Sequence, residues 1–144
     1  MLYRLCAGLP EVLLVHPGGP YWMRRDAGAW QIPKGEIGPS EDPETAARRE
    51  GHEELGLRLV GTMQPLGDIR QKGGKLVTAF AIEHEFDCAT LVSNRFEMEW
   101  PPRSGTKQSF PEVSEARGFS LEDARVAMLP SQAPLLDRLG EMLA

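Results

Sequence analysis

Three glutamates within one helical turn constrain this chain more than any other feature of its sequence. Glu50, Glu53 and Glu54 stand at positions i, i+3 and i+4, so a helix through them places their carboxylates on one side. Like charges at this spacing destabilise a helix by roughly 0.2–0.5 kcal/mol per pair. Folding alone gives no reason to keep such a cluster. Hard divalent cations prefer carboxylate oxygens, so the segment predicts a metal site.

Local signals predict that this helix runs from Pro43 to Leu55. Asp42 is a favourable N-cap, and proline suits the first helical position because its missing N–H has no partner there. Gly56 is placed to end the helix in the left-handed conformation. Gly51, in the middle, costs roughly 1 kcal/mol relative to alanine. Local rules broken at one place, by charge crowding and by glycine, indicate a functional site.

The wider spacing of these residues carries a family resemblance. The segment from Gly35 to Leu57 contains Gly, five residues, Glu, seven residues, Arg-Glu, two residues, Glu-Glu, one residue and Gly. This is the pattern of the Nudix box, so the chain resembles a Nudix hydrolase. If the E-x-x-E-E segment stood by itself, a solvated face of a surface helix would explain it. At roughly 6–7% usage per residue, however, the full pattern occurs by chance about once in a hundred million starting points.

The resemblance implies an activity and a site. Nudix enzymes hydrolyse a nucleoside diphosphate linked to another group, using Mg²⁺ or Mn²⁺ bound by the glutamates of the box. The implied metal ligands are Glu50, Glu53, Glu54 and the main-chain carbonyl of Lys34. Arg49, Glu41 and the box glycine Gly35 are implied to orient these ligands. One position departs from the pattern, because Gly51 replaces a bulky aliphatic residue; the helix then lies closer to the sheet or is held less firmly.

The resemblance also implies one further glutamate from a downstream loop, as metal ligand or general base. The candidates are Glu97, Glu99, Glu112 and Glu115. The segment Phe119–Asp123 looks like the family's short strand and helix start, which makes Glu112 the first choice and Glu115 the second. A solvated side chain is the alternative for each of them. Glu50 is the rival candidate for the general base.

Substrate contacts are indicated less strongly. The W-x-x-P-K-G sequence from Trp30 to Gly35 resembles that of diadenosine polyphosphate hydrolases, which makes Lys34 a candidate phosphate contact. Base stacking by an aromatic side chain is worth about 1–3 kcal/mol in single-strand binders. The candidates for stacking are Trp22, Trp30 and Trp100, with core or loop packing as the more frequent alternative. Arg70, Lys72 and Lys75 surround a predicted turn and are either phosphate contacts or a solvated charged turn.

Composition is that of one ordinary globular domain spanning residues 1–144. The chain has 16 basic and 21 acidic residues and a net charge of −5, with no basic run that predicts a nucleic-acid groove. No apolar run approaches the roughly 20 residues of a membrane span, and no leader is evident, so we expect a cytoplasmic protein. Two cysteines, Cys6 and Cys88, give neither a disulfide framework nor a zinc pattern. The expected partner is a nucleotide-type small molecule; a homodimer is left open.

Periodicity and chain-breaking residues predict an α/β (α+β) Nudix fold, a mixed sheet sandwiched between helices. The expected strands are 2–6, 11–16, 59–63, 66–70, 76–86 and 116–120. The expected later helices are 121–129 and 132–143, and the expected loops are 17–29 and 94–109. The first strand is short, which indicates that the chain starts inside a longer strand and leaves a weakened, exposed sheet edge at Leu2–Leu5.

Two function classes therefore remain. The first is a metal-dependent pyrophosphohydrolase acting on a dinucleoside polyphosphate or a nucleoside triphosphate. The second is a Nudix-fold module that has lost catalysis and senses a nucleotide. Loss of a glutamate from the box would favour the second class. Every glutamate of the box is present, so the sequence favours the first.

Overall fold

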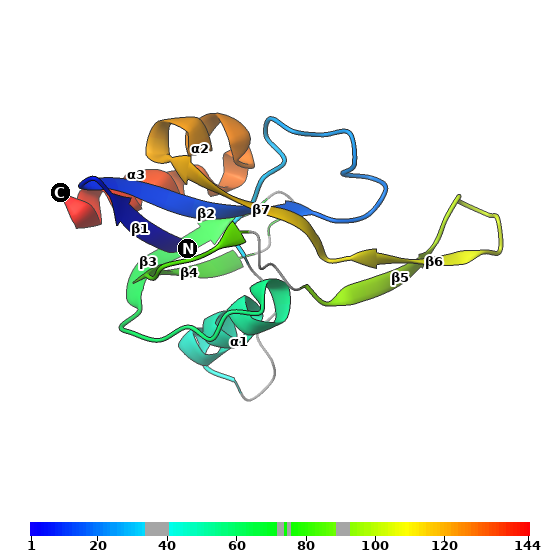
Figure 1. The fold of residues 1–144 in the computed structure, drawn as a ribbon, viewed down its shortest axis with the longest axis horizontal. Helices are drawn as coiled ribbons and strands as arrows, with labels where there is room; N and C mark the ends of the chain where they lie inside the picture. Colours follow the sequence, from blue (N-terminus) through cyan, green and yellow to red (C-terminus); the bar gives the residue numbers. More distant parts are fainter. Residues whose placement is uncertain (34–40, 72–73, 75, 89–92) are drawn as a thin grey trace.

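The protein is a mixed β-sheet held between helices, as the sequence predicts. The computed structural model describes residues 1–33, 41–71, 74, 76–88 and 93–144. The sheet has the strand order β3-β4-β1-β2-β7, and β1 pairs in parallel with β4 and antiparallel with β2. Helix α1 covers one face, and α2 and α3 cover the other (Figure 1). The sheet strands are β1 (Leu2–Cys6), β2 (Leu9–Pro17), β3 (Gln64–Arg70), β4 (Leu76–Glu83) and β7 (Val113–Ser120). The helices are α1 (Pro43–Leu55), α2 (Leu121–Ala127) and α3 (Pro134–Leu143), with a 3₁₀ helix at Pro130–Gln132.

Strand β2 is buried on both faces of the sheet. Val12 and Leu14 point into the core under α2 and α3, whereas Leu13 and Val15 point into the core that contains Leu55 of α1. Alternation along a strand sends successive side chains to opposite faces, so a central strand reads as a continuous apolar run. None of the helices in the described parts of the chain is long and apolar enough to span a membrane.

Helix α1 has the predicted bounds. The Asp42 side chain accepts a hydrogen bond from the main-chain N–H of Thr45 (3.4 Å), and Pro43 takes the first helical position. At the other end Gly56 has a φ of 69°, and its N–H donates to the His52 carbonyl. These caps fix both ends of the helix that carries the glutamates.

The segment after α1 is not the predicted strand 59–63. The Arg48 guanidinium binds it from the helix, donating to the carbonyls of Leu59 (2.9 Å) and Gly61 (2.7 Å). These bonds satisfy carbonyls that strand pairing would otherwise use. Leu59 lies directly over Gly51, where a Cβ atom would come within 2.7 Å of a Leu59 methyl carbon. Leu59 thus fills the place of the bulky side chain that position 51 lacks.

Gly51→Ala is expected to stabilise the protein by about 0.5–1 kcal/mol, because alanine favours helix over glycine by about 1 kcal/mol. The added Cβ meets the free end of the Leu59 side chain, which borders a cavity and has room to turn away. Urea unfolding measures the effect. Gly18→Ala is the control: its Cβ would overlap the main-chain carbonyl of Pro111, so we expect destabilisation. A destabilised Gly51→Ala variant would show that Leu59 is fixed in place.

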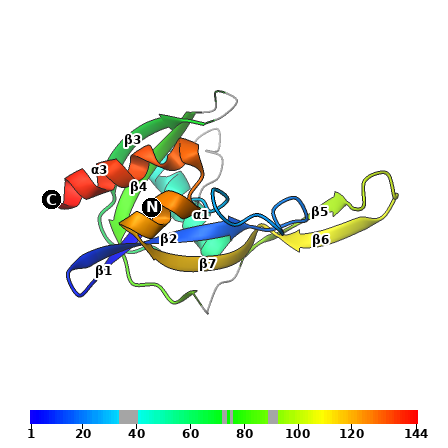
Figure 2. The same ribbon diagram turned by 90° about the horizontal axis from the view of Figure 1, so that it is seen from above.

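The predicted loop 94–109 is instead a two-stranded hairpin. Strands β5 (Arg95–Glu99) and β6 (Lys107–Pro111) pair antiparallel, and the hairpin extends away from the body of the protein (Figure 2). Phe96 and Phe110 lie opposite each other, with their ring centroids 6.0 Å apart. Polar and apolar residues alternate in Arg95–Glu99, which is typical of a strand. The prolines at the hairpin tip favoured the prediction of a loop instead.

Strand β1 lies inside the sheet, so the predicted exposed edge is wrong for the buried Leu2 and Tyr3, whereas Leu5 is 48% exposed. Leu2 and Tyr3 pair with β4 on one side, and β2 pairs with Tyr3 to Cys6 on the other. The last strand starts earlier than predicted, at Val113, and β4 ends earlier, at Glu83.

Candidate active site

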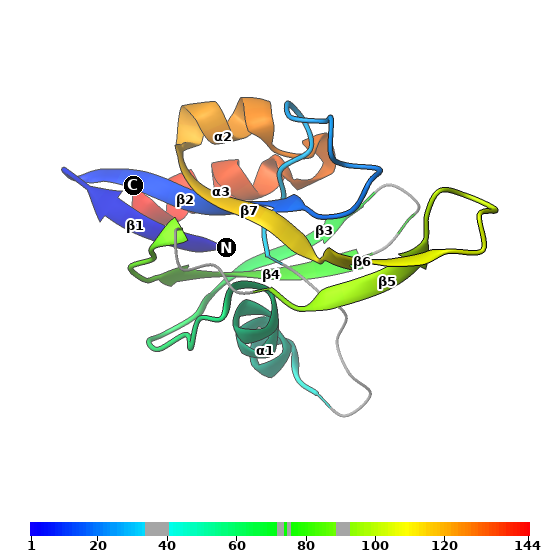
Figure 3. The same ribbon diagram turned by 45° about the vertical axis from the view of Figure 1, so that its right-hand side comes forward.

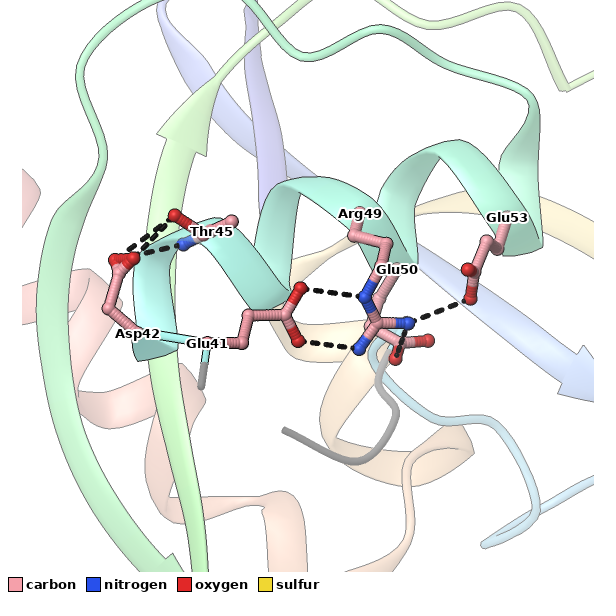
Figure 4. Close-up of polar contacts among 6 residues, drawn as sticks. All are labelled: Glu41, Asp42, Thr45, Arg49, Glu50 and Glu53. Carbon is pink, nitrogen blue, oxygen red and sulfur yellow. Dashed lines mark hydrogen bonds and ion pairs between the residues drawn. The ribbon is translucent and has the colours of Figure 1, made fainter. Parts of the chain in front are cut away.

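One guanidinium group on helix α1 binds three carboxylates, two from the helix and one from Glu41 just before it (Figure 4). Arg49 Nε and Nη2 bind the two oxygens of Glu41 at 2.8 and 2.9 Å. Arg49 Nη1 lies 2.9 Å from Glu50 Oε1 and 3.0 Å from Glu53 Oε2. The planar arginine fork has five donors, so it can serve several carboxylates at once in a way that lysine cannot. Of the predicted orienting residues, Arg49 therefore contacts two of the predicted ligands, Glu50 and Glu53, and Glu41 holds Arg49.

Glu50 is the buried member of this group. Its side chain is 11% exposed, compared with 37% for Glu53. Burial raises the pKa of the Glu50 carboxyl, and the charges of Glu53 and Glu112 act in the same direction, while Arg49 opposes them. A buried carboxylate next to other carboxylates is a place where additional positive charge would be stabilised.

Glu112 is the downstream glutamate that the fold brings to this helix. Its N–H donates to the Asn94 carbonyl (2.8 Å), and the Asn94 N–H donates to the carbonyl of Glu53 (3.1 Å). The charge of Glu112 also acts on Glu50. Glu115 instead pairs with Arg117 at 2.6 Å. The other two candidates, Glu97 and Glu99, lie on the protruding hairpin.

The donor set suits a hard divalent cation in its chemistry. One carboxylate oxygen of Glu50 and one of Glu53 approach the same atom, Arg49 Nη1, and Glu54 lies half-buried on the same helix. Carboxylate oxygens are the ligands that such cations prefer. Within the part of the chain that the structure describes, no three Asp, Glu, His or Cys side chains form a group that could hold an ion. Arg49 provides the cation that Glu50 and Glu53 share in this arrangement. Lys34 and Gly35 lie outside the described residues.

If Arg49 orients metal ligands, as the resemblance implies, Arg49→Lys should reduce activity by about 10- to 100-fold. Lysine keeps the charge but not the fork that holds Glu41 through two bonds while reaching Glu50 and Glu53. The Mg²⁺ concentration for half-maximal rate should rise with it. Arg58→Lys, at an exposed position just after the helix, is the control. Equal activity of wild type and Arg49→Lys would mean that Arg49 contributes only charge.

The predicted aromatic and basic substrate contacts lie elsewhere. Trp30 is 2% exposed, and its indole N–H donates to Asp26 (2.9 Å), so it is a core residue and the stacking prediction for it is wrong. Trp100 contacts Tyr21 beside the hairpin, 5.5 Å between ring centroids. The loop that contains Trp22 lies on the side of the sheet opposite α1 (Figure 3). Arg70 donates to the Gly74 carbonyl (2.9 Å) and holds the turn; Lys72 and Lys75 lie outside the described residues.

Sequence reasoning missed a cavity beside the carboxylates. It lies between α1 and β4, has a volume of about 330 Å³, and is lined by Glu50 and Gly51 among others. The available signal was the set of small residues on one face of α1, Ala46, Ala47 and Gly51.

The fold and the site define a class of α/β proteins in which a helix carries a carboxylate cluster over a mixed sheet. Residues 6–139 match the NUDIX domain family. The chain belongs to the Nudix family, which confirms the resemblance drawn from the box.

Individual relatives match shorter parts of the chain. An RNA pyrophosphohydrolase of Rhodopseudomonas palustris (strain BisB18) is 35% identical over 75 residues, covering 46% of this chain and 41% of that protein. The RNA pyrophosphohydrolase of Cellvibrio japonicus (strain Ueda107) is 50% identical over 48 residues, covering 32% and 28%. The chain thus spans less than half the length of these relatives.

Solved structures match over nearly the whole chain. A binary complex of the C. elegans Ap4A hydrolase has a TM-score of 0.68 at 23% identity, covering 99% of this chain and 93% of that one. The NUDIX domain of Shewanella oneidensis NrtR, complexed with ADP ribose, has a TM-score of 0.67 at 17% identity, covering 99% and 84%. At these identities the likeness concerns the fold, and it confirms the predicted architecture.

Proposed function

We propose that this protein is a Mg²⁺- or Mn²⁺-dependent pyrophosphohydrolase that cleaves a phosphoanhydride bond in a nucleoside di- or polyphosphate derivative. A dinucleoside polyphosphate or a nucleoside triphosphate is the first candidate substrate. The observation that carries the proposal is the convergence of Glu50 and Glu53 on one cationic group, next to Glu112 and a cavity. The Ap4A hydrolase and RNA pyrophosphohydrolase names of similar proteins support the same class of reaction.

The chain's own residues would divide the work as follows. Glu50, Glu53 and Glu54 hold the ion, while Arg49 and Glu41 keep those carboxylates in place. The ion, when bound, supplies positive charge that offsets the phosphates and makes water more acidic. Glu112 or Glu50 accepts the proton of the water that attacks phosphorus. Positioning and electrostatics carry most of the acceleration in such a reaction.

A second candidate substrate is the 5′ end of an RNA, because the curated relatives are named RNA pyrophosphohydrolase. The net charge of −5 and the lack of a basic run argue for a small nucleotide instead. A nucleotide-sensing module without catalysis is the alternative in another class; the NUDIX domain of NrtR, complexed with ADP ribose, shows that this fold binds such a ligand.

The test is turnover of a substrate panel with Mg²⁺ and with Mn²⁺, with products separated by chromatography. The panel holds dinucleoside polyphosphates, the (d)NTPs, ADP-ribose, NADH, a nucleotide sugar and a 5′-triphosphorylated RNA oligonucleotide. Metal-dependent cleavage of one small nucleotide supports the proposal, and the fragments identify the phosphorus attacked. If only the RNA oligonucleotide is cleaved, the substrate is the 5′ end of an RNA and not a small nucleotide. Nucleotide binding without any cleavage would favour the sensor.

Glu112→Gln is expected to lower kcat by about 10²- to 10⁴-fold if its carboxylate is the general base, with KM little changed. Glu115→Gln is a closely matched control, because that residue lies three positions away and pairs with Arg117. Steady-state kinetics on the best substrate of the panel decides the outcome. A Glu112→Gln variant with nearly wild-type kcat would assign the base to Glu50.

A further inference from the structure

A second cavity lies on the face of the sheet opposite α1, beside the loop that joins β2 to Trp30 (Figure 3). Its volume is about 540 Å³, within the range of ligand pockets, about 300–1,000 Å³. That loop lines it together with Phe110 and Pro111 of β6 and the start of β7. The buried Trp30, which also lines it, belongs to the core under α2 and α3. Among the described residues none lines both this cavity and the one beside Glu50, so the two are separate.

Three arginine side chains line the second cavity, and two of them are left without an acidic partner. Arg24 and Arg25 are neighbours in the sequence, and both are exposed. Among the described residues no carboxylate forms an ion pair with either of them, and the Arg25 guanidinium lies over the Trp22 ring, 5.6 Å from its centroid. The third, Arg117, is bound to Glu115 at 2.6 Å. The N–H donors of the first two are therefore available to a ligand.

The two carboxylates that line the second cavity are already engaged. Asp26 Oδ1 accepts the indole N–H of Trp30 (2.9 Å), and Glu115 Oε2 accepts two bonds from Arg117, at 2.6 and 3.1 Å. Three arginines against two carboxylates leave the lining with one excess positive charge, histidine counted as neutral, in a chain whose net charge is −5. A cavity lined by charge of one sign concentrates ligands of the other, so this excess favours an anion.

The loop that carries the two arginines is held by main-chain bonds. Successive turns close over residues 19–22, 22–25 and 26–29, with N–H to carbonyl distances of 3.0–3.3 Å. From strand β2 the buried His16 ring binds the loop as well, with its Nε2 2.5 Å from the Arg25 carbonyl oxygen. A ligand therefore meets donors on a loop that is already ordered, and less entropy is lost on binding.

We propose that the second cavity binds a phosphate-bearing anion, which Arg24 and Arg25 hold on the face of the sheet opposite α1. The planar guanidinium fork matches phosphate oxygens and binds them through charge-assisted hydrogen bonds. The cavity is larger than one phosphate group, and Met23, Phe110 and Pro111 give it apolar surface for an organic group that the phosphate carries. The ligand is thus a free phosphate or pyrophosphate ion or a phosphate ester. The site does not depend on the proposed function, because its described lining includes none of the α1 carboxylates.

The experiment uses ¹⁵N-labelled protein freed of metal ions on a chelating resin, so that hydrolysis plays no part. Phosphate, pyrophosphate and adenosine monophosphate each replace chloride at constant ionic strength, and ¹H–¹⁵N NMR spectra are recorded. We expect saturable shifts of the Trp30 indole N–H and of the main-chain N–H groups of Arg24 and Arg25. The dissociation constant for pyrophosphate should be about 1 mM or below. The main-chain N–H groups of α1 should not shift.

Arginine variants provide the second measurement. Arg24→Gln and Arg25→Gln each remove one guanidinium group and should weaken pyrophosphate binding at least about tenfold, the usual effect of losing a hydrogen bond to a charged group. Both side chains are exposed, so the fold should be kept. Arg58→Gln removes the same charge at an exposed position after α1 and should leave binding unchanged. Glu53→Gln, in the carboxylate cluster, should leave it unchanged as well.

The outcomes separate the second cavity from the carboxylate cluster. Binding that is weakened by the variants at Arg24 and Arg25, and not by Arg58→Gln, supports the site. Shifts confined to α1, unweakened binding by both arginine variants or equal weakening by Arg58→Gln would overturn it. The absence of any saturable shift would overturn it too, while the proposed hydrolase would still stand. Tighter binding of adenosine monophosphate than of phosphate identifies the ligand as a phosphate ester, whereas equal binding identifies the phosphate group alone; both support the site.

Discussion

Replacing Glu53 with glutamine is expected to lower kcat by at least about 100-fold on whichever substrate the panel identifies. Loss of a residue that only orients a metal ligand already costs about 10–100-fold, so loss of a ligand should cost more. Glutamine keeps the shape of the side chain but removes the charge that both a divalent ion and Arg49 require. Glu54→Gln should behave alike. Steady-state kinetics across a range of Mg²⁺ concentrations measures the effect.

The fold should survive this change. The Glu53 side chain is 37% exposed, and ion pairs at such positions contribute little to stability. Arg49 keeps its bonds to Glu41 and Glu50, so the melting temperature should stay close to that of the wild type. Glu97→Gln removes the same charge on the exposed face of β5 and should leave kcat unchanged. Full activity in both Glu53→Gln and Glu54→Gln would show that these carboxylates do not hold a catalytic metal ion.

Helix α1 could be predicted from sequence because its determinants are local. The Asp42 cap, Pro43 and Gly56 act on their own neighbours, and each was found where the sequence places it. The contact between Arg49 and Glu53 follows from their i, i+4 spacing along the helix. The position of Glu112 depended instead on a family resemblance, because the bonds that bring it to α1 pass through Asn94, far away in sequence.

Features set by tertiary contact could not be predicted. Leu59 looks like a strand residue, but the Arg48 side chain and the space above Gly51 determine its place. The cavity beside Glu50 exists because several small residues from separate segments meet there. The small residues of α1 are visible in the sequence, but the strand and the segment that close the cavity over them are not.

Trp30→Ala is expected to destabilise the protein by about 3–5 kcal/mol, the usual cost of truncating a buried aromatic side chain to alanine. Trp30 is 2% exposed and packs edge-on against His16 and Phe119, with ring centroids 5.2 and 5.1 Å away. Its N–H bond to Asp26 would be lost as well. Domains of this size are stable by only about 5–15 kcal/mol, so urea unfolding should show a large shift.

Trp100→Ala is the control for Trp30→Ala, because it removes the same kind of side chain from a position outside the core. Trp100 lies in the connection between β5 and β6, against Tyr21 and outside both cores, so its loss should change the free energy of unfolding far less. If Trp30 were a stacking residue, Trp30→Ala would instead keep its stability and raise KM for nucleotides. Retained stability together with a raised KM would return Trp30 to the substrate site. A large loss of stability with unchanged KM in the folded fraction assigns it to the core.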